Sequence, residues 1–288
     1  MKPKIIIAGL AQNCSQYLSS VLENIEKFNS IASQVEYIFV ENDSEDNTKE
    51  IISDWLDSDK SHELINLDGL KHLPIRTLRL ESARNTYIEL IKYKKDFFVE
   101  YDYLVILDMD DVNTSPLNLE ELIKVFNFLN SSMDIGAVFA NQLGTYYDMW
   151  ALRHPTICPN DVWEEVFDWS VRYQASDEKA YANTLHKRKI SIDPTSGPIE
   201  VDSAFGGLGI YKMSYVLNNP NPYLGSKVKV LIDEEGTLKF HRWQVCEHVH
   251  FNRGIKNQGG RLFIFPSLIN NINQGITFPS STFRYLLF

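Results

Sequence analysis

The chain has 288 residues, of which 44% are apolar and 23% are charged, as in ordinary globular proteins. Its formal net charge of −10 argues against a nucleic-acid partner, because such partners need a basic surface. Its three cysteines lie far apart and form no C-x-x-C pair, which argues against a zinc site or a disulfide framework and favours a reducing compartment.

The apolar run at residues 5–11 is short and continues into Gln12 and Asn13 rather than into a cleavage site. We therefore interpret it as the first core strand and not as a signal peptide. No apolar run approaches the ~18 residues that a membrane-spanning helix needs. The sequence predicts a cytoplasmic protein without a transmembrane segment, and it leaves peripheral contact with a membrane open.

Strand and helix patterns alternate through the first half of the chain. Apolar, β-prone runs predict strands at 5–8, 35–40, 64–67, 103–107 and 135–140. Between them, apolar residues at helical spacing predict helices over 14–28, 51–56, 83–91 and 119–129. This order predicts an α/β fold with a mostly parallel sheet flanked by helices.

The second half is more irregular. Residues 144–197 are aromatic and polar, and a turn-rich stretch follows at 218–222. A helix is predicted over 245–256 and a strand over 261–265. Because no repeat or long linker occurs, we expect one domain over 1–288, with a nucleotide-binding half at 1–140 and an acceptor or catalytic half at 141–288.

Three aspartates, Asp108, Asp110 and Asp111, follow the apolar run at 103–107, where a buried strand would end. Side chains at i and i+2 leave a strand on the same side, so Asp108 and Asp110 can converge on one cation. Oxygen ligands suit Mg²⁺ or Mn²⁺, which usually carry substrate phosphates as well. A solvated acidic turn is the alternative, and the strand that precedes the motif favours metal binding.

Further short segments occur in an order that is typical of one enzyme family. They are G-L-A-Q-N at 9–13, V-E-N-D-S-E-D-N-T at 40–48, S-A-R-N at 82–85, A-F-G-G-L-G at 204–209, C-E-H-V-H at 246–250 and G-G-R-L-F-I-F-P at 259–266. With D-M-D at 108–110, they resemble the glycosyltransferases of the A-type fold, in particular the family-2-like enzymes. The second segment is similar to the V-D-D-G-S-x-D-x-T signature of that family. The segment Y-D-M-W-A-L-R at 147–153 is also similar to the Y-D-x-W-x-x-R pattern of capsule mannosyltransferase-like enzymes.

The resemblance implies a metal-dependent enzyme of polysaccharide biosynthesis that uses Mn²⁺ or Mg²⁺. Its donor would be a UDP- or GDP-sugar, and its acceptor a hydroxyl of a glycan or of a lipid-linked or protein-linked molecule. The residues implied on the donor side are Ala8, Glu41, Asp43, Arg84, Asn85, Asp108, Met109, Gly206 and Gly207. Arg84 would pair with a phosphate or with the D-x-D carboxylates, and a structural ion pair is the alternative. The glycines would let backbone approach the donor sugar closely.

On the acceptor side, the resemblance implies that Asp148, Trp150, Arg153 and Asp202 bind sugar. Aromatic faces stack on sugar rings and carboxylates hold hydroxyls, although core packing is the alternative for Trp150.

Glu247 stands where many relatives have Glu-Asp, and the resemblance implies that it is the general base of an inverting transfer. His248 replaces the second acid and competes for that role. Members of the fold often use a late histidine as a metal ligand, but none follows His250. His250 competes with His248 for the role of base, and either could bind metal instead, so the third protein ligand stays open. We name His250 as the metal candidate beside Asp108, Asp110 and Asp111, and a surface histidine is the alternative for both.

Two rival functions remain open from the sequence. The run V-I-L-D-M-D-D-V at 105–112 also resembles the nucleophile motif of haloacid-dehalogenase-type phosphatases, in which Asp108 would form an aspartyl-phosphate. That motif normally lies on the first strand, whereas two or three β-α units precede it here. A non-catalytic sugar-binding module would explain the aromatic residues but not the acidic motif.

Overall fold

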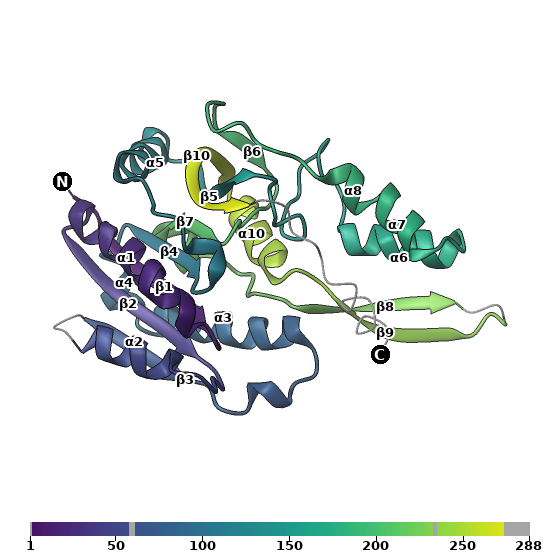
Figure 1. Cartoon of the computed structure of the whole chain (residues 1–288), viewed down its shortest axis with the longest axis horizontal. Helices are drawn as coiled ribbons and strands as arrows, with labels where there is room; N and C mark the ends of the chain where they lie inside the picture. Colours follow the sequence, from purple (N-terminus) through teal and green to yellow (C-terminus); the bar gives the residue numbers. More distant parts are fainter. Residues whose placement is uncertain (1, 58–60, 233–234, 274–288) are drawn as a thin grey trace.

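The computed structural model describes residues 2–57, 61–232 and 235–273. Its centre is an eight-stranded sheet with the strand order β3-β2-β1-β4-β7-β5-β10-β6 (Figure 1). The strands are β1 (Lys4–Ala11), β2 (Gln34–Glu41), β3 (His62–Asn66), β4 (Tyr103–Asp108), β5 (Ile135–Gly144), β6 (Ile199–Val201), β7 (Leu208–Lys212) and β10 (Arg261–Asn273).

The sheet is mostly parallel, as the sequence predicted. β3, β2, β1 and β4 pair in parallel, and β10 pairs in parallel with β5. β7 runs antiparallel between β4 and β5, and β6 is antiparallel to β10. The carboxyl ends of β1 and β4 therefore meet at one edge of the sheet, where open α/β folds bind their ligands.

Helices cover both faces of the sheet, and β1 shows how side chains are divided between them. Ile5 and Ile7 join a core with α1 (Ser15–Ile31), α2 (Thr48–Leu56) and α5 (Leu119–Ser131). Ile6 and Ala8 join the opposite core with α3 (Arg76–Tyr93), α4 (Lys95–Phe98), α9 (Met213–Leu217) and α10 (Glu247–Asn257). Because both faces are covered, β1 has an uninterrupted apolar run in place of an alternating pattern.

The segment 144–197 contains three helices between its loops: α6 (Val162–Arg172), α7 (Asp177–Asn183) and α8 (Leu185–Arg188). The sequence pattern did not predict them. The N-cap of α6 is Asp161, whose carboxylate accepts from the backbone N–H groups of Trp163 and Glu164. An aspartate cap followed by acidic residues is a start signal for a helix, and it was available in the sequence.

Further elements were missed, among them β7 of the central sheet and a separate two-stranded ribbon. β7 is only five residues long and begins within the glycine-rich segment, yet it lies between β4 and β5. β8 (Ser226–Ile232) and β9 (Leu238–Gln244) form a separate antiparallel ribbon that projects from the sheet (Figure 1). Trp243 on one face of the ribbon packs edge-on against Phe167 of α6, with ring centroids 4.7 Å apart. Val228, Val230 and Phe240 on the other face are exposed.

Two short 3₁₀ turns complete the described elements, at Leu70–His72 and Asp111–Asn113. Among the helices of the described residues, none is both long and apolar enough to cross a membrane.

Candidate active site

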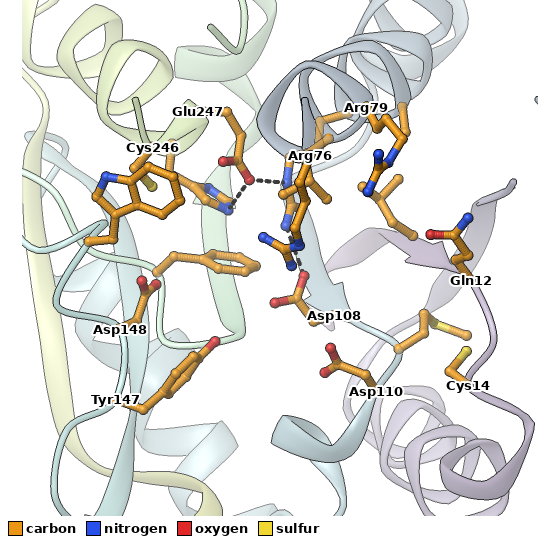
Figure 2. A pocket seen from close by; sticks show the side chains of 18 of the residues that line it. Gln12, Cys14, Arg76, Arg79, Asp108, Asp110, Tyr147, Asp148, Cys246 and Glu247 are labelled. Carbon is orange, nitrogen blue, oxygen red and sulfur yellow. Dashed lines mark hydrogen bonds and ion pairs between the residues drawn. The ribbon is translucent and has the colours of Figure 1, made fainter. Parts of the chain in front are cut away.

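A cavity of about 690 Å³ opens at the carboxyl ends of β1 and β4, between the two halves of the chain (Figure 2). The first half contributes Leu10, Ala11, Gln12, Cys14, Asn42, Arg76, Arg79, Leu80, Ala83, Arg84, Asp108, Met109 and Asp110. The second half contributes Tyr147, Asp148, Met149, Trp150, Val162, Trp163, Leu185, Phe205, Cys246, Glu247 and His248. The structure thus brings the D-x-D carboxylates, Asp148, Trp150 and the Glu247-His248 pair to one cavity.

Asp108 and Asp110 lie on the first-half wall. Asp108 is the last residue of β4, and Asp110 caps the following turn by accepting from the Val112 N–H at 3.3 Å. The pKa of Asp110 is raised to about 7, because the cavity walls desolvate its carboxylate and because Asp108 and Asp111 add negative charge. The Asp110 side chain nevertheless reaches the open cavity, so a cation there could relieve this repulsion.

Asp111 is exposed and does not line the cavity. Across the described part of the chain, no cluster of three or more His, Cys, Asp or Glu residues has the geometry of a metal site. An ion at this wall could take only Asp108 and Asp110 as carboxylate ligands among the described lining residues of the D-x-D turn, and its remaining ligands would be water or a phosphate. That coordination pattern is usual for Mg²⁺ and suits Mn²⁺, which shares its preference for oxygen ligands.

Arg84 connects the two walls of the cavity. Its Nη2 donates to Asp108 Oδ1 at 2.8 Å, and its Nε donates to Glu247 Oε1 at 3.0 Å. The guanidinium is buried and lies over the Phe205 ring, 5.0 Å from the centroid. One cation is thus shared by two carboxylates that come from positions 139 residues apart in the sequence. The ion pair with the D-x-D carboxylate, one of the alternatives considered for Arg84, is present.

Glu247 and His248 begin α10 on the opposite wall. His248 is buried, and its ring stacks on Phe205 with centroids 3.8 Å apart. Burial, together with the positive charge of Arg84, lowers the pKa of His248 well below its ordinary value, so the imidazole is neutral. His248 Nε2 lies 3.6 Å from Glu247 Oε1, and within the described residues neither ring nitrogen has a hydrogen-bond partner.

Asp148 and Trp150 lie in the loop after β5. Asp148 accepts hydrogen bonds from the Ala151 N–H at 3.1 Å and from the Gly206 N–H at 3.0 Å. Burial outweighs these two bonds and raises the pKa of Asp148 to about 6. The Trp150 ring lines the cavity, while its Nε1 donates to Asp161 at 3.2 Å. Trp150 therefore lines the cavity and is anchored by its polar edge.

Gly206 and Gly207 support the cavity from behind. Their φ angles are +65° and +80°, a region that residues with a Cβ rarely adopt. A Cβ on Gly206 would lie 2.6 Å from the Ala140 carbonyl, and one on Gly207 would lie 2.5 Å from Val112 Cγ1. The Gly207 carbonyl accepts from the Asp108 N–H at 2.9 Å. The glycines thus let the loop pack against the aspartate turn.

Several donor-side candidates have structural partners outside the cavity lining. Glu41 accepts from the Ser44 N–H at 2.8 Å. Asp43 accepts from the N–H groups of Gly69 and Lys71, and these hydrogen bonds hold its pKa below the ordinary value. The Asn85 side chain bonds to both backbone groups of Tyr223. Ala8 is fully buried within β1.

The other outlying candidates are on the acceptor side. Arg153 forms an ion pair with Asp161 at 2.8 Å, which fixes the loop that carries Trp150. Asp202 pairs with Lys256 at the surface. His250 is half-buried in α10 and does not line the cavity. The structure therefore does not bring Arg153, Asp202 or His250 to the D-x-D carboxylates.

Sequence reasoning missed Arg76 and Arg79, which line the cavity from the first turn of α3 (Figure 2). The helix was predicted only from about residue 83, because apolar periodicity is weak before it. Two arginines at i and i+3, five residues or more before Arg84, were the available signal. The positive charge of Arg76 acts to lower the pKa of Asp110, although burial and the neighbouring carboxylates outweigh it.

Comparisons with known proteins identify the family and the fold of the chain. A family model described as "Glycosyl transferase family 2" matches residues 10–192. No curated protein matches the chain. Among solved structures, residues 1–349 of S. aureus TarS are similar with a TM-score of 0.50 and 13% identity, covering 94% of this chain and 60% of that chain.

The mannosyltransferase PcManGT from Pyrobaculum calidifontis, solved with GDP-Man and Mn²⁺, is similar with a TM-score of 0.50 and 14% identity, covering 98% of this chain and 59% of that chain. At such identities the likeness shows a shared fold, the glycosyltransferase A-type. The chain spans about three-fifths of the length of these two proteins. Because the family match covers more than half of its length, the chain belongs to glycosyl transferase family 2.

Proposed function

We propose that this protein is a metal-dependent, inverting glycosyltransferase that moves a sugar from a UDP- or GDP-sugar to an acceptor hydroxyl. The observation that carries the proposal is the cavity in which Asp108 and Asp110 stand on one wall and Glu247 on the other, with Arg84 between them. We take residues 1–288 as one catalytic domain, with residues 1–140 as the nucleotide-binding half and residues 141–288 as the acceptor half.

On the donor wall, Asp108 and Asp110 would hold Mn²⁺ or Mg²⁺, and Arg76 and Arg79 would add positive charge near the phosphates. The bound ion would stabilise the departing diphosphate as a Lewis acid. Support comes from the uncompensated negative charge at Asp110 and from the Mn²⁺ complex of PcManGT. Arg84 is engaged with two carboxylates, so we assign it to positioning Asp108 and Glu247.

On the acceptor wall, Glu247 would accept the proton of the attacking hydroxyl while the oxygen bonds to the anomeric carbon. The nucleoside diphosphate would leave with the bonding electron pair from the opposite face, which inverts the configuration. Neutral His248 can hydrogen-bond the same hydroxyl, because its nitrogens have no partner among the described residues. It is the next candidate for the base. Asp148 and Trp150 would hold the sugar by hydroxyl bonds and ring stacking.

The acceptor class stays open among glycans, lipid-linked molecules and protein-linked molecules. A cytoplasmic location and a contact with a membrane surface also stay predictions. The phosphatase alternative has lost its support, since the chain belongs to a glycosyltransferase family. A non-catalytic sugar-binding module would bind the nucleotide-sugar without turnover, and the assay below separates it from an enzyme.

The proposal is tested by titrating UDP and GDP into the protein by calorimetry, with Mn²⁺ and with EDTA. We expect binding of one nucleotide that depends on the metal. Release of that nucleotide from its sugar esters, followed by NMR of the product's anomeric carbon, then tests transfer and inversion. Binding that is indifferent to EDTA would refute the metal site, and a retained configuration would refute the role of a base.

A further inference from the structure

Three buried side-chain amides lie directly behind the cavity. Asn113, Gln142 and Asn270 have at most 1% of their surface exposed. Asn270 Nδ2 donates to Asn113 Oδ1 at 2.8 Å, and Gln142 Nε2 donates to Asn270 Oδ1 at 2.9 Å. The three amides therefore form a continuous chain of hydrogen bonds, which we call the amide chain.

The amide chain holds backbone carbonyls of the cavity wall. Asn113 Nδ2 donates to the carbonyls of Asp108 at 2.7 Å and Gly207 at 2.8 Å. Asn270 Nδ2 and Gln142 Nε2 both donate to the Gly206 carbonyl, at 2.8 and 2.9 Å. The D-x-D turn and the glycine loop, about a hundred residues apart in sequence, are thereby joined through side chains from β5 and β10.

The same connection reaches Asp148. The backbone N–H of Gly206 donates to the Asp148 carboxylate at 3.0 Å. Gly206, whose carbonyl is held by Asn270 and Gln142, therefore also holds that carboxylate. The side-chain oxygen of Gln142, Oε1, accepts from the backbone N–H of Tyr147 at 3.4 Å, and Tyr147 directly precedes Asp148. The position of Asp148 relative to Asp108 is thus set by a rigid set of bonds behind the cavity.

Apolar side chains could not take the place of the amide chain, because they offer no donors for the backbone carbonyls that it holds. Gly206 and Gly207 have positive φ angles and no side chains, so their carbonyls need donors from elsewhere. A buried polar group without a partner costs about 1–3 kcal/mol, and a fully satisfied network makes its surroundings rigid. The amide chain satisfies the Gly206 and Gly207 carbonyls and holds them at a fixed distance from Asp108.

We propose that Asn113, Gln142 and Asn270 are positioning residues that set the spacing between the metal-binding turn and Asp148 of the sugar subsite. This inference rests on the proposed function. Nucleotide affinity depends on charge and tolerates a small shift of the loop, whereas transfer needs the reacting atoms aligned. A misplacement of about 1 Å can cost roughly 100-fold in rate.

The test compares Asn270→Leu and Gln142→Met with the control Asn141→Leu. Asn141 is also fully buried, but its Nδ2 donates to the carbonyls of Ile192 and Pro266, which do not line the cavity. For each variant we would measure the melting temperature, the affinity for UDP and GDP with Mn²⁺, and kcat and KM for nucleotide release from the donor. Hydrogen exchange of residues 108–113 and 204–208 adds a measurement that needs no activity.

We expect all three variants to lose similar thermal stability. Asn270→Leu and Gln142→Met should lose at least about 10-fold in kcat with nucleotide affinity within about three-fold, and should speed exchange in both segments. Asn141→Leu should keep kcat and leave the exchange unchanged. If all three variants keep the same kcat and the same exchange, the inference is wrong.

If both amide-chain variants fail to fold while Asn141→Leu folds, these side chains serve stability and the positioning role is refuted. If the wild-type protein binds no nucleotide and turns over no donor, the proposed function fails by itself. Faster exchange in the two segments would then still support the structural link between them, and unchanged exchange would remove that link as well.

Discussion

The two walls of the cavity are built by different means. On the first wall, Asp108 ends a strand whose position and direction are set by hydrogen bonds to β1. On the second wall, Asp148 comes from a loop and Glu247 from the start of a helix, and both depend on side-chain contacts to hold them. A wall set by a sheet is rigid through its backbone, whereas a wall set by loops needs specific side-chain bonds.

This difference suggests that the two walls contribute to different steps, the first to binding and the second to turnover. Nucleotide and metal binding should depend on charges at strand ends, while turnover should depend on how the second wall is held. Arg84 and the amide chain (Asn113, Gln142 and Asn270) join the two walls. The following predictions test this division, beginning with the largest expected effect.

Glu247→Gln should remove the function of the second wall, which is turnover, and leave nucleotide binding at the first wall intact. We expect a loss of about 10²–10⁴-fold in kcat, as for a missing general base, with nucleotide affinity largely kept. The measurement is steady-state kinetics beside calorimetry. His248→Gln is the comparison: if it loses turnover and Glu247→Gln does not, the base is His248. A lower melting temperature is expected as well, because the buried Arg84 loses the more buried of its two carboxylate partners.

Asp110→Asn should weaken metal-dependent nucleotide binding at the first wall. It removes one of the two D-x-D carboxylates that line the cavity, and we expect Mn²⁺-dependent nucleotide affinity to fall by about 10–100-fold. Calorimetric titration of UDP and GDP measures this directly. Asp111→Asn is the matched control, because Asp111 is exposed and outside the cavity lining. Equal losses in the two variants would mean that general negative charge, and not a site, attracts the metal.

Trp150→Ala should weaken the use of the sugar donor without weakening binding of the free nucleotide. The variant removes a ring that lines the cavity, so kcat/KM for the donor should fall by about 10-fold, in line with roughly 1–1.5 kcal/mol for an aromatic contact. The affinity for the free nucleotide should stay the same. A parallel loss of nucleotide affinity and melting temperature would instead assign Trp150 to core packing against Trp163.

Asp148→Asn should change how stability depends on pH. The folded-state pKa of Asp148 is about 6, above the ordinary value of about 4, so the folded protein binds this proton more tightly than the unfolded chain. Its contribution to the free energy of unfolding therefore falls as pH rises from about 4 to about 6. The variant lacks this component, and its melting temperature should fall less steeply over that range. Parallel profiles in differential scanning calorimetry would contradict the assignment.

Asp202→Ala should have the smallest effect. Asp202 lies in a surface ion pair with Lys256, and such pairs contribute about 0–1 kcal/mol. We expect unchanged kcat and KM and a melting temperature close to that of the wild type. A large loss of kcat/KM would restore Asp202 as a sugar ligand and would extend the second wall beyond the cavity described.

The sequence itself determined the parallel half of the fold and the place of the aspartates. Continuous apolar runs such as 5–8 and 103–107 predict strands buried on both faces, and polar residues just after such strands lie at one edge of the sheet. The D-x-D motif was found by this local rule. The order of short motifs over the whole chain indicated the family, which its family model confirms.

Tertiary structure alone decided which of the candidates face one another. Local pattern could not predict that Arg84 lies between Asp108 and Glu247, that Arg76 reaches the cavity, or that Asp202 lies outside it. It also missed β7, because five residues after a glycine loop carry too little signal without neighbouring strands. The physical reason is common to these cases: hydrogen bonds and ion pairs between distant segments depend on how the segments pack, and sequence spacing does not encode that distance.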